Sequence, residues 1–135
     1  MKNVDLVIID YLGLMQSARR TENRVQEISD ITRNLKIMAK DLKVPVLVCA
    51  QLSRGTEGKG SNHKPALSDL RDSGSIEQDA DIVLFLYREG YYKNEKDDPT
   101  QVDDHKSECI VAKNRHGESK TIELYWDPQY TRFSS

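Results

Sequence analysis

The sequence contains no long apolar run, and no stretch approaches the roughly 18 residues that a membrane-spanning helix needs. We therefore expect no membrane contact. Only two cysteines occur, Cys49 and Cys109, and both lie in apolar runs. Two thiols at this spacing form neither a metal-binding pattern nor a disulfide framework, which favours buried free thiols in a cytoplasmic protein.

The chain also has no excess of positive charge, because its 20 Lys and Arg residues are outnumbered by 22 Asp and Glu residues, which gives a formal net charge of −2. No global positive field draws the chain to nucleic acid, so any such contact must come from a local patch. The stretch Gly55–Ser61 is rich in glycine, but its spacing does not match G-x-x-x-x-G-K-[ST]. It also does not lie between a strand and a helix, so we expect an ordinary loop there.

The N-terminal segment has no signal-peptide pattern. Met1–Asn3 leads directly into Val4–Asp10, an apolar run that ends abruptly on a carboxylate. Leu6–Ile9 lacks polar alternation, which is typical of a strand buried on both faces of a parallel sheet. A buried central strand rarely opens a chain, so we expect this sequence to be a fragment whose first half is missing.

Asp10 stands where this first strand leaves the sheet. Ligands of open α/β folds bind at the carboxyl ends of the strands, and a carboxylate there can hold Mg²⁺ beside a nucleotide's phosphates. The run therefore has the form of a Walker B element.

A long helix should follow, because Ile28, Ile31, Leu35, Met38 and Leu42 recur at steps of three and four. Asn23 can cap its start and Pro45 limits its end. Val46–Ala50 forms a second apolar run that ends on Gln51. A strand, helix and strand in this order form a parallel βαβ unit with a right-handed crossover, so Asp10 and Gln51 should reach the same edge.

The remaining residues suggest shorter elements within a single domain, 1–135. Residues 67–78 should form a short helical segment broken by Gly74, and 89–108 an acidic, flexible loop. Further strands are expected at the ranges 82–87, 109–112, 121–125 and 130–133, with Gly117 in the turn between the second and third.

Several segments resemble motifs of the DnaB-type replicative helicases. Val7–Leu12 is similar to their Walker B motif and Val46–Arg54 to motif H3. Ser68–Tyr87 resembles motif H4 nearly throughout, and its first part, to Asp81, is the most specific match. Lys113–Gly117 and Thr131–Phe133 resemble the family's C-terminal strands.

The resemblance implies an α/β fold, namely a partial RecA-like core with a parallel βαβ unit and C-terminal antiparallel strands. It also implies an ATP-dependent hexameric DNA helicase that unwinds duplex DNA at the replication fork by translocating on single-stranded DNA. ATP and Mg²⁺ would be the cofactors. Primase and a helicase loader would be partners.

The same resemblance assigns roles to matching residues. Asp10 would hold Mg²⁺, and Gln51 would sense the γ-phosphate. Lys113 and Arg115 would reach into the nucleotide of the neighbouring subunit, with Arg115 as an arginine finger that stabilises charge on the transferring phosphoryl group. Their spacing of two along a strand predicts that their side chains share one face.

DNA contacts would come from Arg71, Asp72 and Gly74. Arg71 can pair with a phosphate, and the backbone near Gly74 can approach one closely. The family commonly has glutamate where this chain has Asp72, so the carboxylate is kept but shortened. Lys59, Lys64 and Arg54 would add nonspecific attraction to the DNA backbone.

The family's Walker A loop and catalytic glutamate lie upstream of the Walker B strand, and neither has a counterpart here. We therefore expect this chain alone to be unable to hydrolyse ATP. Apolar surface normally covered by those upstream elements should be exposed, so we also expect dimers or larger species.

Each of these residues also has a purely structural interpretation. Asp10 could cap the next turn, Gln51 could satisfy backbone groups, and Arg71 could pair with Asp69 or Asp72 at the surface. Lys113 and Arg115 could be a solvated face of a hairpin. Two other functions stay open: a RecA-like recombinase-type ATPase, or a non-catalytic module for DNA binding or subunit contact.

Overall fold

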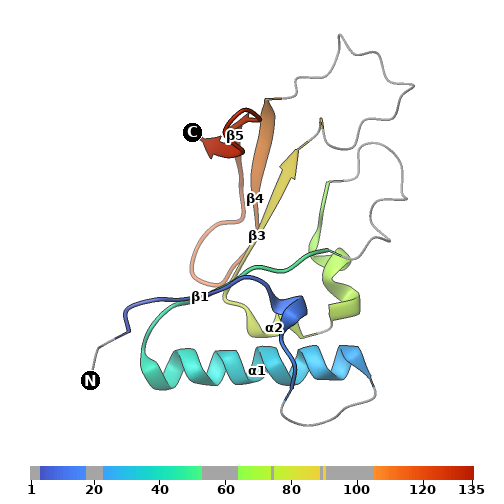
Figure 1. The fold of residues 1–135 in the computed structure, drawn as a ribbon, viewed down its shortest axis with the longest axis vertical. Helices are drawn as coiled ribbons and strands as arrows, with labels where there is room; N and C mark the ends of the chain where they lie inside the picture. Colours follow the sequence, from blue (N-terminus) through green and yellow to red (C-terminus); the bar gives the residue numbers. More distant parts are fainter. Residues whose placement is uncertain (1–3, 18–22, 53–63, 74, 89, 91–104) are drawn as a thin grey trace. The chain divides into compact units, whose positions relative to one another are not determined.

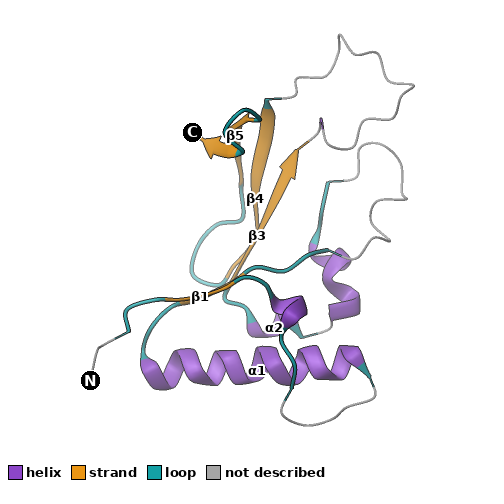
Figure 2. Ribbon diagram, in the orientation of Figure 1, coloured by secondary structure: helices purple, strands orange, loops and turns teal. Residues whose placement is uncertain are grey.

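The computed structural model describes residues 4–17, 23–52, 64–73, 75–88, 90 and 105–135, with only the backbone of 71–73. The chain divides into two compact units. Unit 1 comprises Met1–Ser53 and Leu70–Ala80, and unit 2 comprises Arg54–Asp69 and Asp81–Ser135. Each unit is described by itself (Figures 1 and 2).

Unit 1 is built on the predicted βαβ arrangement. Strand β1 (Val7–Ile9) and strand β2 (Val46–Val48) are parallel, with Val7 opposite Val46 and Ile9 opposite Val48. Helix α1 (Arg24–Leu42) connects them (Figure 1). The sequence therefore predicted the type and order of these elements correctly, although both strands are shorter than the apolar runs that contain them.

Helix α1 begins and ends near the predicted positions. The side chain of Asn23 accepts a hydrogen bond from the backbone N–H of Val25 at 2.9 Å, which satisfies one of the free donors of the first turn. At the other end, Lys43 adopts the left-handed conformation with φ 56°, and its N–H donates to the carbonyls of Ala39 and Lys40. This C-cap, two residues before Pro45, ends the helix at Leu42.

The first part of the predicted apolar stripe of α1 forms the core of unit 1, whereas Leu42 at its end is 52% exposed. Ile28 and Ile31 are buried together with Leu12. The partly buried residues packed against this cluster are Met15, Leu35, Val48 and Ile76.

The opposite side of the β1–β2 pair differs from the sequence prediction. Ile8 and Leu47 lie directly across from each other and are 60% and 51% exposed. The two strands are thus partly buried on one face and exposed on the other, because the cluster with α1 involves only one side of the pleat.

The segment after Lys64 contains the predicted helical turns. The 3₁₀ helix η3 (Leu67–Ser73) is followed by the single-turn helix α2 (Ile76–Asp79). Gly74, the predicted break between them, lies outside the described residues. Three side chains join α1 to α2: the hydroxyl of Thr32 donates to Asp79 Oδ2 at 2.7 Å and lies 2.7 Å from the hydroxyl of Ser75.

Unit 2 contains a four-stranded antiparallel sheet in the order β3-β4-β5-β6. These strands are β3 (Ile82–Arg88), β4 (Lys106–Asn114), β5 (Thr121–Asp127) and β6 (Arg132–Ser134). The β3–β4 pairing contains a bulge: Val83 faces Lys113 and Leu84 faces Val111, so Ala112 is the extra residue. The predicted fold class, α/β with a parallel βαβ unit and C-terminal antiparallel strands, is therefore confirmed in these coarse terms.

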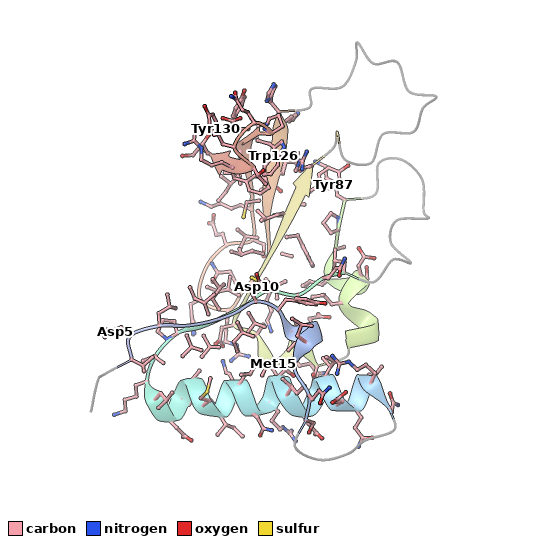
Figure 3. All side chains as sticks on the ribbon, viewed as in Figure 1. Asp5, Asp10, Met15, Tyr87, Trp126 and Tyr130 are labelled. Carbon is pink, nitrogen blue, oxygen red and sulfur yellow. The ribbon has the colours of Figure 1, made fainter. Side chains whose placement is uncertain are left out.

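The sheet of unit 2 also buries one face more deeply than the other. Val83, Phe85 and Tyr87 on β3 are buried, whereas Ile82, Leu84 and Leu86 are more than half exposed. Tyr87 and Trp126 are labelled in Figure 3 on β3 and β5. Trp126 stacks on the guanidinium of Arg88, whose central carbon lies 4.0 Å from the ring centroid, and it packs against Phe133.

Two sequence predictions need correction here. Residues 106–108, predicted as the end of an acidic loop at 89–108, belong instead to β4, which begins at Lys106 and buries Ser107 and Glu108; residues 89 and 91–104 lie outside the described part. The cysteines are not both buried: Cys49 is exposed and Cys109 is only partly covered. Cys49 follows the last residue of β2, so it lies at the end of the sheet instead of inside it.

No helix within the described ranges is long and apolar enough to cross a membrane.

Candidate functional site

Asp10 and Gln51 lie at one edge of unit 1, as the sequence predicted. Ile9 and Val48 pair as the last residues of β1 and β2. Beyond them, the N–H of Cys49 donates to the carbonyl of Ile9, and the N–H of Leu12 donates to the carbonyl of Cys49, both at 2.9 Å. These bonds hold the two carboxyl ends together (Asp10 is labelled in Figure 3). Both Asp10 and Gln51 are exposed there.

The chain after Asp10 is held by the start of helix α1. The guanidinium of Arg24 donates to the carbonyls of Met15 at 3.1 Å and Gly13 at 2.9 Å, and it pairs with Glu27. Glu27 in turn accepts a hydrogen bond from the N–H of Ser17 at 2.9 Å. This backbone hydrogen bond, and then the Arg24 side chain, lower the pKa of Glu27 below its ordinary value of 4.5.

This edge has the chemistry that a nucleotide-bound metal ion requires. Mg²⁺ is usually held by one or two carboxylates together with phosphate oxygens and water. The exposed carboxylate of Asp10 fits that donor set, and Gln51 lies three residues beyond the end of the neighbouring strand. Among the described residues no group of three His, Cys, Asp or Glu side chains forms a complete metal cage. The 3₁₀ helix η1 (Leu12–Leu14) has no side-chain cap, so Asp10 does not serve as one.

Lys113 and Arg115 lie in unit 2, near the end of β4. Lys113 is within the strand, opposite Val83, but β4 ends at Asn114 and Arg115 belongs to the following turn. Strand alternation therefore does not extend to Arg115, and the shared face stays a prediction. Arg115 Nη1 lies 2.9 Å from Asp81 Oδ1, so this side chain is ion-paired and not merely a solvated hairpin residue.

The predicted DNA-contact residues lie on and after η3. Arg71 and Asp72 are in its last turn, where the structure describes only the backbone. Hydrogen bonds are described on either side of this segment. Asp69 Oδ2 accepts from the N–H of Ala66 at 2.8 Å at the start of η3, and α2 is joined to α1 through Thr32.

Lys64 leads into η3 and pairs with strand β4. Its Nζ lies 2.7 Å from both carboxylate oxygens of the nearly buried Glu108 and 5.9 Å from the ring centroid of Tyr87. Lys64 was predicted to attract DNA nonspecifically. The structure shows that it neutralises a carboxylate within its own unit, which reduces the positive charge available to a phosphate.

Comparisons with known proteins show the family. The profile of the DnaB-like helicase C terminal domain matches residues 1–135. The chain belongs to this family. It is 50% identical over 129 residues to the replicative DNA helicase DnaB of Leifsonia xyli, covering 96% of this chain and 27% of that protein. It thus spans less than a third of the length of this curated relative.

Two solved structures share the fold of this DnaB-like chain. One is an ATPase domain that superposes with a TM-score of 0.82 at 43% identity, covering 95% of this chain and 43% of its own. The other, a DnaB-like replicative helicase solved in a study of its interactions with primase, gives the same TM-score and identity over 95% of this chain and 30% of its own. The resemblance drawn from the motifs is therefore confirmed.

Sequence reasoning missed several side chains that organise these DnaB-like motifs. Asp81 and Thr32 contact residues 34 and 47 positions away, Arg115 and Asp79, and no local pattern signals such pairs. Arg24 and Glu27 did carry a signal, because opposite charges three residues apart at a helix start commonly pair.

Proposed function

We propose that this chain forms part of an ATP-dependent hexameric DNA helicase that moves along single-stranded DNA and unwinds the duplex at the replication fork. The observation that carries the proposal is that Asp10 directly follows β1 and Gln51 follows β2, at the carboxyl ends of two paired parallel strands in a DnaB-like chain. Ligands of open α/β sheets bind at this edge. The family match favours a helicase over a recombinase-type ATPase.

Each motif residue takes one part of a divided site. Asp10 would hold Mg²⁺, which would neutralise charge on the nucleotide's phosphates, and Gln51 would contact the γ-phosphate. Lys113 and Arg115 would approach the nucleotide of a neighbouring subunit. A guanidinium at that position stabilises the charge of the transferring phosphoryl group without forming a covalent bond.

Single-stranded DNA would meet the segment with Arg71, Asp72 and Gly74. A guanidinium and backbone N–H groups together give a contact with the phosphate backbone that does not depend on sequence. The relation to a helicase studied with primase supports primase as a partner. A helicase loader, a RecA-like core completed by further sequence, and a cytoplasmic location belong to the same proposal.

The test is a chimera in which this chain replaces the matching 129-residue stretch of the Leifsonia xyli helicase. We expect DNA-stimulated ATP hydrolysis and hexamers by light scattering. Arg115→Ala should lower turnover by roughly a thousandfold or more, as fingers of this kind do. Binding of a fluorescent ATP analogue should persist.

Arg33→Ala is the matched control, because Arg33 is an exposed arginine of α1. It should leave turnover unchanged. Normal turnover with Arg115→Ala would refute the finger role. Hexamers that bind DNA but do not hydrolyse ATP, even without substitutions, would support a non-catalytic module instead.

A further inference from the structure

We propose that Asp81 is a positioning residue that holds the Arg115 guanidinium in the orientation needed to reach a neighbouring subunit's nucleotide. The inference rests on the proposed function of Arg115. Two contacts join the residues: Arg115 Nη1 lies 2.9 Å from Asp81 Oδ1, and the N–H of Arg115 donates to the carbonyl of Asp81 at 2.9 Å. Backbone and side chain of Arg115 are thus held by one residue.

The backbone on both sides of this pair is fixed by the hairpin. Asp81 directly precedes β3, whose first residue, Ile82, pairs with Asn114. The side chain of Asn114 accepts from the N–H of His116 at 3.3 Å, which stabilises the turn that follows Arg115. A Cβ on Gly117 would lie 2.6 Å from Asn114 Nδ2, so the turn also packs closely against this side chain.

The contact leaves most of the guanidinium available. Arginine carries five N–H donors in a planar fork, and a single oxygen of Asp81 engages one nitrogen. Nearly half of each side chain is exposed, at 47% for Arg115 and 44% for Asp81. The remaining donors can therefore reach an anionic group from outside the subunit while the Asp81 contact persists.

The exposure of the Asp81–Arg115 pair also indicates that Asp81 orients Arg115 and does not inhibit it. An exposed ion pair is weak and shifts the equilibrium between its paired and unpaired forms by at most about fivefold. It therefore cannot keep Arg115 away from a nucleotide phosphate. The same pair can reduce the number of orientations that a long side chain samples, which favours a reaction that depends on placement. We therefore expect Asp81 to raise turnover.

The experiment uses the chimera described above, with Asp81→Asn, which removes the charge and keeps the size. The kcat of DNA-stimulated ATP hydrolysis should fall about fivefold. The KM for ATP and the hexamer mass should not change. Asp81→Glu should recover at least half of the activity. Asp41→Asn, at an exposed position of α1, is the matched control and should leave kcat unchanged.

A role through Arg115 is distinguished from a general structural role by combining Asp81→Asn with Arg115→Lys. A lysine has no fork for Asp81 to orient, so the added loss should be well below fivefold. An equal loss in both backgrounds, or an unchanged kcat in Asp81→Asn while Arg115→Ala is inactive, would overturn this inference alone. Normal turnover in Arg115→Ala would remove the finger role and this inference with it.

Discussion

Glu27 links the start of helix α1 to the segment that follows Asp10. It accepts the N–H of Ser17 and pairs with Arg24, whose guanidinium also holds the carbonyls of Met15 and Gly13. These contacts require an ionised carboxylate. Folding therefore favours the charged form of Glu27, which is why its pKa is lowered.

This pKa predicts the direction of a pH effect. The contribution of Glu27 to stability should be fully present above its ordinary pKa of 4.5 and be lost as pH falls through the lowered folded value. Glu27→Gln should thus lower the urea midpoint at neutral pH, and the difference should shrink in acid. In Arg24→Ala, the Glu27 pKa measured by NMR should move back toward 4.5; an unchanged pKa would contradict the assigned cause.

Single residues also show how far sequence reasoning reached. The shared edge that carries Asp10 and Gln51 was predicted correctly, because parallel strands bring their carboxyl ends together, although β2 ends three residues before Gln51. The ion pair of Arg115 was not foreseen, since it depends on the register of β3 against β4. Register is set by pairing across the sheet, and a motif in one strand does not contain it.

At the scale of elements, Thr32 is the main polar link between α1 and α2. Its hydroxyl contacts Asp79 and Ser75 at 2.7 Å. Thr32→Val keeps the shape but leaves a partly buried carboxylate without this donor, so stability should fall by about 1–2 kcal/mol. Urea denaturation of the purified chain would measure the loss.

The matched control is Thr32→Ser, which keeps the hydroxyl and should lose less than half as much. Equal losses in both variants would show that the methyl group of Thr32, and not its hydrogen bonds, stabilises the contact. If the α1–α2 link positions the preceding DNA-contact segment, Thr32→Val in the chimera should also weaken binding of single-stranded DNA.

Element types were predictable, but their ends and exposures were less so. The periodicity of α1 and its Asn23 cap are local, and both were read correctly. The start of β4 at Lys106 was hidden in a polar stretch, because Ser107 and Glu108 are buried only through contacts with distant residues: Leu124 accepts from Ser107, and Lys64 pairs with Glu108. Polar composition alone therefore suggested a loop.

At the scale of the whole molecule, exposed apolar strand faces should drive association. Ile82, Leu84 and Leu86 project from one face of β3, with exposed fractions of 53–60%. Burying such a face against a second copy is favourable at about 25 cal/mol per Å² of apolar surface. The purified chain should therefore form dimers or larger species by light scattering at high concentration.

Replacing these three residues with threonine keeps strand propensity and removes much of the apolar surface, so the apparent mass should fall toward the monomer. Leu14→Ser is the control, because Leu14 is 70% exposed but lies outside the strands. A clean monomer of the unsubstituted chain would contradict the prediction. Equal effects of both changes would show that the β3 face has no special role.

The bulge at Ala112 has a consequence for how this sequence can diverge. Substitution there changes one side chain, whereas loss of that residue would remove the bulge, with its local bend and added twist, just before Lys113. Related genes should therefore tolerate point mutations at this codon more readily than in-frame deletions. Chain length just before Lys113 and Arg115 would then be inherited more strictly than the identity of the residue that supplies it.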